Sequence, residues 1–191
     1  MYAGYTIKVP KFLDFIFTFP LLTYRRLRFG YPYRKIYLGE GEFTIVDADI
    51  YYRLGRFKWF LVGSKKKFYA ARNIKTGPCQ IKIVRLHRVI MNPPDGLLID
   101  HQNGNSLDNR RANLRFATRS QNATNRQKRK KGSSRFNGVS IEKRTGRWRA
   151  RICYQGKKMY LGSFDSEIDA ALAYDAAAKK YHGEFACLNF S

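Results

Sequence analysis

Alternation of arginines with apolar residues over positions 147–152, in a run that continues to Tyr154, is the feature that most constrains how this chain folds. Arginines at every second position are separated by apolar or aromatic residues: Arg147, Arg149 and Arg151 alternate with Trp148, Ala150, Ile152 and Tyr154. Because successive side chains of a β-strand point to opposite faces of a sheet, this pattern predicts a strand with one cationic face and one apolar face. The apolar face requires a second layer to cover it, and the cationic face suits a polyanion.

The residues that follow predict that second layer. Residues 154–157 favour a hairpin turn, after which Lys158 and Tyr160 return on the polar face while Met159 and Leu161 return on the apolar face. A near capping box at residues 166–169 then opens a predicted helix that ends at Gly183. Its packing residues are expected at helical spacing: Ile168, Ala171, Leu172, Tyr174, Ala178 and Tyr181. The C-terminal part is therefore predicted to be a small sheet covered by one helix.

The charge of the chain indicates the class of its partner. The 191 residues include 37 lysines and arginines against 14 acidic residues, a net charge of +23, and 44% of the residues are hydrophobic. A chain with this apolar content can build cores, so the excess charge favours nucleic acid as the partner, ahead of an anionic membrane. Between Arg110 and Arg151, 15 basic residues accompany one acid, Glu142. The cationic run at residues 126–131 is interpreted as a linker, or as a solvated charge run without a partner.

The N-terminal part gives a fold signal without a readable function. Short apolar runs between glycines predict a small β-rich unit over residues 36–71, and Asp47 is a candidate cap for a short helix through about Leu54. The aromatic segment 12–24 is broken by Asp14 and Pro20 and is shorter than the roughly 20 apolar residues that cross a bilayer. It is either an amphipathic element or a region ahead of the true domain start. Three widely spaced cysteines indicate neither a disulfide framework nor a thiolate zinc site, which fits a reducing cytoplasm.

Residues that can carry chemistry gather between positions 80 and 125. Residues 80–91 predict a strand that passes into a helix, and residues 97–99 predict a short buried strand that leads to Asp100 and His101. Hydrolysis of a phosphodiester needs a hard cation held by oxygen ligands and a base that deprotonates water. Asp100, His101 and a downstream asparagine can supply that set, because magnesium keeps several waters and needs only one or two protein ligands. Taken alone, such an Asp-His pair is more often structural.

The residues around this pair resemble the HNH homing-endonuclease-like family in type, order and spacing. The resemblance covers about residues 86 to 126 and rests on the stretches 86–90, 99–105, 107–110, 113–115 and 121–122. It implies a strand, a turn and a helix wrapped around one divalent metal, which we expect to be magnesium, with manganese as the alternative. This resemblance favours the catalytic interpretation of the Asp-His pair over the structural one.

The resemblance also implies a role for each matching residue. Asp100 is expected to be a metal ligand, His101 the general base, and Asn122 on the following helix the second metal ligand. Asn113 matches the middle asparagine of the family name and is expected to steady the loop that holds the base. His87 matches the leading His-Arg pair, either with a direct role or as a packing residue beside the site. Many relatives have a further histidine where this chain has Asn122, so the metal preference stays open.

Residues 134–190 resemble the plant APETALA/ethylene-response-factor DNA-binding domain. The matching stretches are 134–140, 148–152, 160–165, 170–177 and 188–190. Such domains place a three-stranded sheet in the major groove, which is wide enough to admit strands. The resemblance implies that six side chains face DNA: Arg144, Arg147, Arg149, Arg151, Lys158 and Tyr160. Plant domains often have arginine where this chain has Ser140 and Glu142, so their target sequence does not transfer.

Together these inferences predict an α+β chain in five parts. The parts are an N-terminal segment of unclear role (1–35), a small β-rich unit (36–78), a ββα-metal HNH nuclease module (79–126), a basic linker (127–133), and a three-stranded antiparallel sheet packed on one helix (134–191). The predicted function is a metal-dependent, homing-type DNA endonuclease of a phage or mobile element, which nicks or cuts both strands. The expected partner is double-stranded DNA, in the cytoplasm, nucleoid or nucleus, with no membrane and no obligate protein partner.

Two other classes of protein compete with the endonuclease. The main alternative is a DNA-binding transcription regulator with an inactive nuclease core, although the joint presence of Asp100, His101, Asn113 and Asn122 argues against decay. An RNA-binding protein is disfavoured, because the C-terminal sheet resembles a reader of duplex DNA and lacks an obvious set of exposed base-stacking aromatics.

Overall fold

The computed structural model describes residues 11–64, 67–124 and 132–190, which fall into two compact units. The first unit comprises the described residues up to Ile90 together with Ser106–Arg111. The second comprises Met91–Asn105 and the described residues from Ala112 onward. The loop between His101 and Asn113 therefore has its middle in the first unit and both of its ends in the second.

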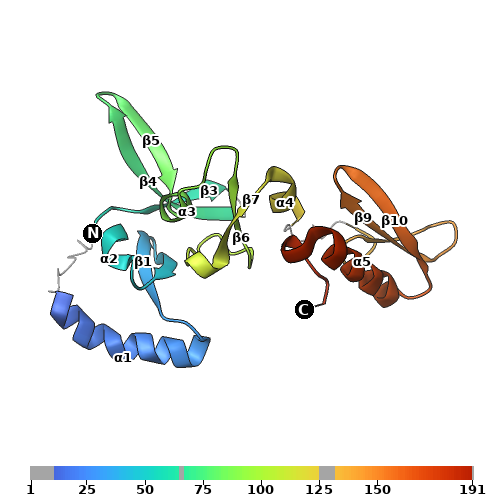
Figure 1. Cartoon of the computed structure of the whole chain (residues 1–191), viewed down its shortest axis with the longest axis horizontal. Coiled ribbons are helices and arrows are strands. Elements are labelled where there is room, and N and C mark those ends of the chain that lie inside the picture. The colour runs from blue at the N-terminus through green and yellow to red at the C-terminus, as the bar shows by residue number, and fades with distance from the viewer. Residues whose placement is uncertain (1–10, 65–66, 125–131, 191) are drawn as a thin grey trace. The chain divides into compact units, whose positions relative to one another are not determined.

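The first unit joins two small antiparallel sheets to three helices (Figure 1). Its elements are α1 (Lys11–Phe29), β1 (Tyr33–Gly39), β2 (Glu42–Asp47), α2 (Tyr51–Leu54), β3 (Phe60–Ser64), β4 (Lys67–Gly77), β5 (Gln80–Arg85) and α3 (Leu86–Met91). β1 pairs with β2, and the other sheet has the order β3-β4-β5. Val46, Leu54 and Leu86 are the largest fully buried apolar residues of the shared core. The strands predicted over residues 36–71, and the strand that passes into a helix over residues 80–91, are present in the structure.

Two details of the N-terminal prediction need correction or completion. Asp47 does not cap the short helix, because α2 begins only at Tyr51 and its N-cap, Ile50, has no side-chain bond. The aromatic segment 12–24 lies within α1, which continues through Pro20. Asp14 on this helix pairs with Arg34 at 3.0 Å, and the hydrogen bond from Arg34 holds the pKa of Asp14 below its usual value. Among the helices of the described ranges, none is both long and apolar enough to cross a membrane.

The second unit begins with a short hairpin and a helix. Its elements are β6 (Leu98–His101), the 3-10 turn η1 (Arg111–Asn113), β7 (Leu114–Ala117) and α4 (Arg119–Thr124). β6 and β7 pair antiparallel, and α4 packs against both strands. Ile99, Leu114 and Ala117 are buried, so the predicted buried strand is confirmed, with Asp100 and His101 as its last two residues.

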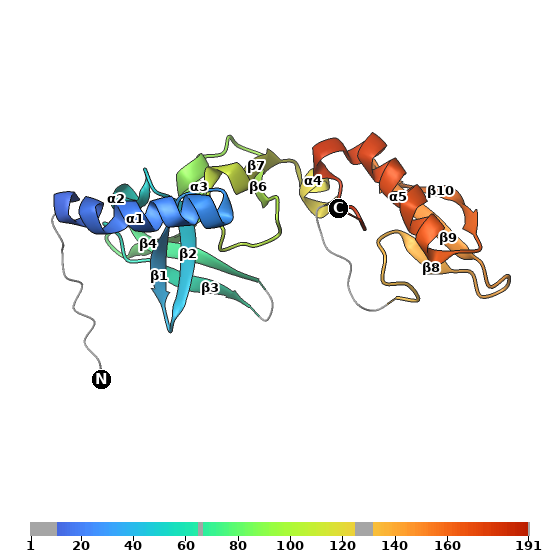
Figure 2. The ribbon, with the colours of Figure 1, turned by 90° about the horizontal axis from the view of Figure 1, so that it is seen from below.

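The C-terminal part is a three-stranded antiparallel sheet with one helix packed on it, as predicted (Figure 2). Its elements are β8 (Val139–Ile141), β9 (Trp148–Tyr154), β10 (Lys157–Phe164), α5 (Glu167–His182) and the 3-10 turn η2 (Gly183–Phe185). The central strand is β9. Gln155 and Gly156 both have positive φ, 49° and 76°, as a two-residue hairpin turn matched to the strand twist requires. At Gly138 (φ +70°) a Cβ would overlap the Tyr174 ring, so only glycine lets the chain pass there.

The face that α5 turns toward the sheet is only partly the predicted one. Ser166 caps the helix by accepting hydrogen bonds from the backbone N–H groups of residues 168 and 169, and the helix ends before Gly183, both as predicted. Ile168 and Leu172 do not pack, since each is 51% exposed. Ala171 and Ala178 are buried as predicted, and the helix also buries Ala170 and Asp175. Alanines let the helix approach the sheet closely, so the largest apolar residues do not mark the contact face.

The predicted α+β fold class is confirmed. The protein mixes helices with several small antiparallel sheets, and the C-terminal helix packs on a three-stranded sheet.

Candidate nuclease site and nucleic-acid interface

Asp100 and His101 occupy consecutive positions at the end of β6. Consecutive side chains of a strand point to opposite faces, yet both of these are enclosed, with 5% and 4% of their surface exposed. In the register of the hairpin Asp100 stands opposite Arg115, and His101 stands opposite Leu114. A charged and a titratable side chain enclosed in this way have restricted orientations, which a positioned catalytic group requires.

Arg115 is a partner of Asp100 that sequence reasoning did not find. Its Nε and Nη2 donate to Oδ2 of Asp100 at 3.0 and 2.8 Å, and both side chains are largely buried. Its Nη1 also donates to the carbonyl oxygen of Glu184, and its guanidinium lies 3.9 Å from the centroid of the Phe185 ring. A signal was available, because pairing of residues 98–101 with residues 114–117 sets opposite charges directly across the hairpin.

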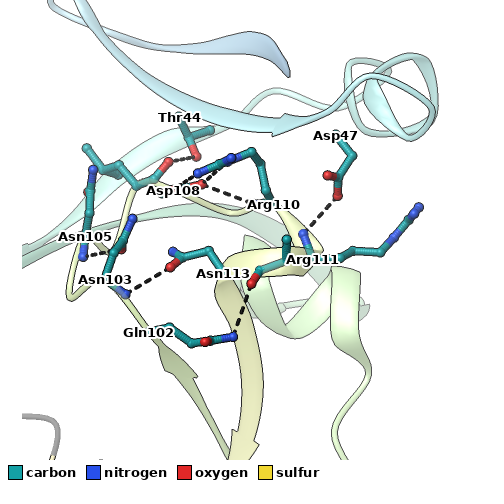
Figure 3. Close-up of polar contacts among 11 residues, drawn as sticks. Thr44, Asp47, Gln102, Asn103, Asn105, Asp108, Arg110, Arg111 and Asn113 are labelled. Atoms are coloured by element: carbon teal, nitrogen blue, oxygen red, sulfur yellow. Dashed lines mark hydrogen bonds and ion pairs between the residues drawn. The ribbon is translucent and has the colours of Figure 1, made fainter. Parts of the chain in front are cut away.

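Asn113 binds the start of the loop that follows His101 (Figure 3). Its side-chain Oδ1 accepts a hydrogen bond from the backbone N–H of Asn103 at 3.0 Å, and its carbonyl oxygen accepts one from Gln102 at 2.9 Å. The Gln102 side chain donates to the carbonyl oxygen of Ala112 at 3.1 Å, and Asn103 Oδ1 accepts from the N–H of Asn105 at 2.9 Å. These contacts fix the backbone directly after His101.

The middle of the same loop, Ser106–Arg111, is bonded to β2 within the first unit. Thr44 Oγ1 donates to the carbonyl oxygen of Leu107 at 2.7 Å, and Asn109 Nδ2 donates to Thr44 Oγ1 at 2.8 Å. The backbone adds an N–H to O bond from Ile45 to Leu107 at 3.0 Å and one from Asn109 to Ile45 at 2.9 Å. Thr44 and Asn109 are fully buried. No local pattern predicts contacts between residues more than 60 positions apart, so sequence reasoning could not find them.

Charged groups complete the attachment of this loop, as Figure 3 shows. Arg110 pairs with Asp108 at 2.6 Å, and that hydrogen bond raises the pKa of Arg110 although partial burial opposes the rise. The guanidinium of Arg110 stacks on the ring of Tyr31, 3.4 Å from its centroid. The backbone N–H of Arg111 donates to Asp47 Oδ2 at 2.9 Å.

The other two predicted site residues lie on helices. Asn122 is half-buried on α4, which packs against the strand that bears Asp100 and His101. Its backbone N–H donates to the carbonyl oxygen of Thr118 at 3.0 Å. His87 belongs to α3 in the first unit, where it is 6% exposed and its ring centroid lies 5.5 Å from that of Tyr69. Within the described residues, no three His, Cys, Asp or Glu side chains gather as a metal-binding group.

The predicted DNA-facing residues lie on the sheet face opposite α5 or beside it. Arg149 is flanked in register by Ser140 and Ser163, and Arg151 stands opposite Tyr160, which is 60% exposed. Arg144 and Lys158 are exposed as well. Two of the arginines have acidic neighbours: Arg147 pairs with Asp165 at 2.9 Å, and Arg149 approaches Glu142 at 3.8 Å.

Comparison with known proteins assigns the two parts. Residues 84–124 match the HNH endonuclease family, and residues 134–184 match the AP2 domain. An uncharacterized HNH endonuclease of Acanthamoeba polyphaga mimivirus is 30% identical over 157 residues, which cover 79% of this chain and 76% of that protein. Because this likeness spans most of both chains, the chain belongs to the HNH endonuclease family. Its C-terminal part is an AP2 DNA-binding domain.

Plant proteins are similar to this chain over segments about as long as the C-terminal domain. APETALA2-like protein 2 of Oryza sativa subsp. indica is 49% identical over 59 residues, and an AP2-like ethylene-responsive transcription factor of Arabidopsis thaliana is 50% identical over 58 residues. These segments cover 31% and 30% of this chain but only 14% and 12% of the plant proteins.

Proposed function

We propose that the protein is a homing-type endonuclease of a phage or mobile element that hydrolyses double-stranded DNA with a divalent cation. The observation that carries the proposal is the pair of consecutive enclosed residues, Asp100 and His101, on a strand that contacts the helix bearing Asn122. The module that cuts corresponds to residues 79–126, and residues 134–191 position it on DNA.

The donor set suits a hard divalent cation. The Asp100 carboxylate and the Asn122 side-chain amide offer oxygen ligands, which magnesium and manganese accept, and magnesium needs few protein ligands because it retains water. Arg115 holds the carboxylate through Oδ2, which fixes its orientation. A cation held by these two residues would stabilise the negative charge that develops on the phosphate.

The chain's own residues perform the remaining steps of the proposed reaction. A ring nitrogen of His101 accepts a proton from water, the water oxygen attacks phosphorus, and the bond to the leaving oxygen breaks. The leaving oxygen departs as an alkoxide and takes a proton from solvent water. Asn113 steadies the loop after His101 through its bonds to the backbone of residues 102 and 103. His87, packed against Tyr69 in the first unit, has no assigned proton transfer.

Incubation of the purified protein with supercoiled plasmid tests this function. With magnesium or manganese present, we expect the plasmid to become open-circular or linear, and with a chelator present we expect it to stay supercoiled. DNA binding without cleavage under either metal would contradict the proposal and support a transcription regulator with an inactive nuclease core.

Loss of two arginines of the C-terminal sheet should weaken DNA binding and make the affinity less dependent on salt concentration. Each phosphate contact contributes about 0.9 to the slope of log affinity against log salt, so replacing Arg149 and Arg151 by alanine should lower the slope by about 1.8 if both contact phosphate. If they contact guanine edges instead, each loss should cost about 1–3 kcal/mol on a preferred site and little elsewhere.

A matched pair on the opposite side of the domain controls for net charge. Lys179 and Lys180 are exposed at the end of α5, and their replacement by alanine should leave affinity and slope nearly unchanged. The measurement is titration of labelled duplex across a salt series with a chelator present. Equal effects of both double substitutions would argue against the assignment of the sheet face.

A further inference from the structure

The three-stranded sheet of the first unit, β3-β4-β5, extends at one end into a two-stranded ribbon of β4 and β5. We call this ribbon, residues 72–84, the arm. β3 pairs only with Lys67 to Ala71 of β4, whereas β5 pairs with β4 from Ala71 to Gly77. Beyond Ala71 the ribbon therefore has only two strands. Figure 1 shows it in green, extending away from α3 at its base.

The arm exposes apolar side chains on one of its faces. Ile81 and Ile83 are 65% and 54% exposed and stand opposite Lys75 and Asn73 in the register of the hairpin. Lys82 is exposed on the other face, opposite Ile74. Two neighbouring exposed isoleucines are unfavourable in water, so this face is suited to contact with a partner.

Charge indicates the chemistry of that partner. From Ile50 to Pro94 the sequence contains 11 basic residues and no acidic residue. In the described part of this stretch, no basic side chain forms an ion pair. A ribbon that combines unneutralised lysines with exposed apolar groups is complementary to duplex DNA, whose phosphates are anionic and whose thymine methyl groups are apolar.

We propose that the arm binds in the major groove of duplex DNA as a contact separate from the C-terminal sheet. The major groove admits a two-stranded β-ribbon, which is the geometry of residues 72–84. Lys75 and Lys82 contact phosphates on either side, and Ile81 and Ile83 contact base edges. This inference rests on the proposed function for its substrate, since it assumes that DNA is what the nuclease unit engages.

Charge removal on the arm tests the phosphate contacts. In the full chain with a chelator present, the double substitution Lys75→Gln and Lys82→Gln should weaken binding to labelled duplex more than tenfold at about 0.1 M salt and lower the salt slope by about 1.8. The control, Arg26→Gln with Arg28→Gln, removes the same charge from exposed positions of α1 and should change neither value. Equal binding by the arm variant and the unchanged protein, or equal losses in both variants, would overturn the proposal.

A native thiol at the tip of the arm tests its location on DNA. Cys79 is exposed in the turn between β4 and β5, so the substitutions Cys153→Ser and Cys187→Ser leave one thiol to carry an iron-chelate DNA-cleaving reagent. We expect strand scission at one segment of a bound duplex, displaced from the segment cut when only Cys153, exposed on β9, is labelled. Absence of scission from labelled Cys79 would overturn the proposal.

Self-association is the competing role for the arm, because β5 is an edge strand among the described residues and could pair with a second copy of the chain. If the protein self-associates without DNA, and Ile81→Thr with Ile83→Thr abolishes association but leaves DNA affinity intact, the arm is an interface between copies and the proposal fails. The binding and scission experiments do not depend on metal-dependent cleavage. A protein that never cuts plasmid can therefore still confirm the arm, and an active nuclease can still disprove it.

Discussion

Replacing His101 with alanine is expected to lower the rate of DNA cleavage at least about 100-fold, because a positioned general base contributes roughly that much. DNA affinity should stay nearly unchanged, since the proposed function assigns the positioning on DNA to residues 134–191 and proton transfer to His101. Single-turnover cleavage of a labelled duplex and titration of the same duplex with a chelator present measure the two quantities.

The third histidine of the chain provides the control for this prediction. His182 lies at the end of α5, where burial lowers its pKa, and it takes no part in the proposed site. His182→Ala should retain the full cleavage rate. If His101→Ala also cleaves at the unchanged rate, His101 is not the base.

Substitution of either proposed metal ligand should be nearly as damaging as substitution of both. Asp100→Asn and Asn122→Ala should each reduce cleavage by about 100-fold or more, and each should raise the metal concentration that gives half-maximal cleavage. The double variant should be little worse than the single ones, because residues that act as a unit are not additive. Independent, multiplicative losses would indicate that the two side chains do not share an ion.

A variant of a second buried ion pair serves as the control that distinguishes loss of metal binding from loss of stability. Asp100→Asn also disturbs the pair with Arg115, whereas Asp108→Asn disturbs the comparable pair with Arg110 at 2.6 Å and leaves the ligands in place. Both variants should lose thermal stability, but only Asp100→Asn should change the metal dependence. The same shift in both would mean that Asp100 acts through folding.

Sequence patterns predicted the elements better than the contacts between them. The strand β9, its hairpin turn and the cap at Ser166 follow from local alternation and turn chemistry, which neighbouring residues determine. The predicted face of α5 was partly wrong, because the close fit of alanines against the sheet depends on the strands beneath the helix, chiefly β9 and β10, rather than on hydrophobicity along the helix. The bonds from Thr44 to the nuclease loop depend on tertiary structure and leave no periodic signal.

In the candidate site, too, the sequence predicted which residues and elements take part but not the contacts between them. Family spacing identified Asp100, His101, Asn113 and Asn122 as candidates, and three of these four lie on elements that the sequence placed correctly. The pairing of Arg115 with Asp100 becomes evident only in the register of the hairpin, which motif spacing does not contain. The sequence indicates the arm less clearly than it indicates the dense basic stretch after Arg110. The indication is that no acidic residue occurs from Ile50 to Pro94, rather than that basic residues are crowded together.

The hydrogen bonds between β2 and Ser106–Arg111 determine which segment of the chain can be transferred to another protein as a nuclease module. A cassette that transfers residues 79–126 into another protein would lose the hydrogen bonds that Thr44 forms with the Leu107 carbonyl and the Asn109 amide, and each lost bond contributes about 0.5–1.5 kcal/mol to stability. A cassette that begins ahead of β1 would keep these bonds. A nuclease module that keeps its hydrogen bonds after transfer to another protein therefore has to include the residues from β1 onward, and is much longer than the matching family segment, residues 84–124.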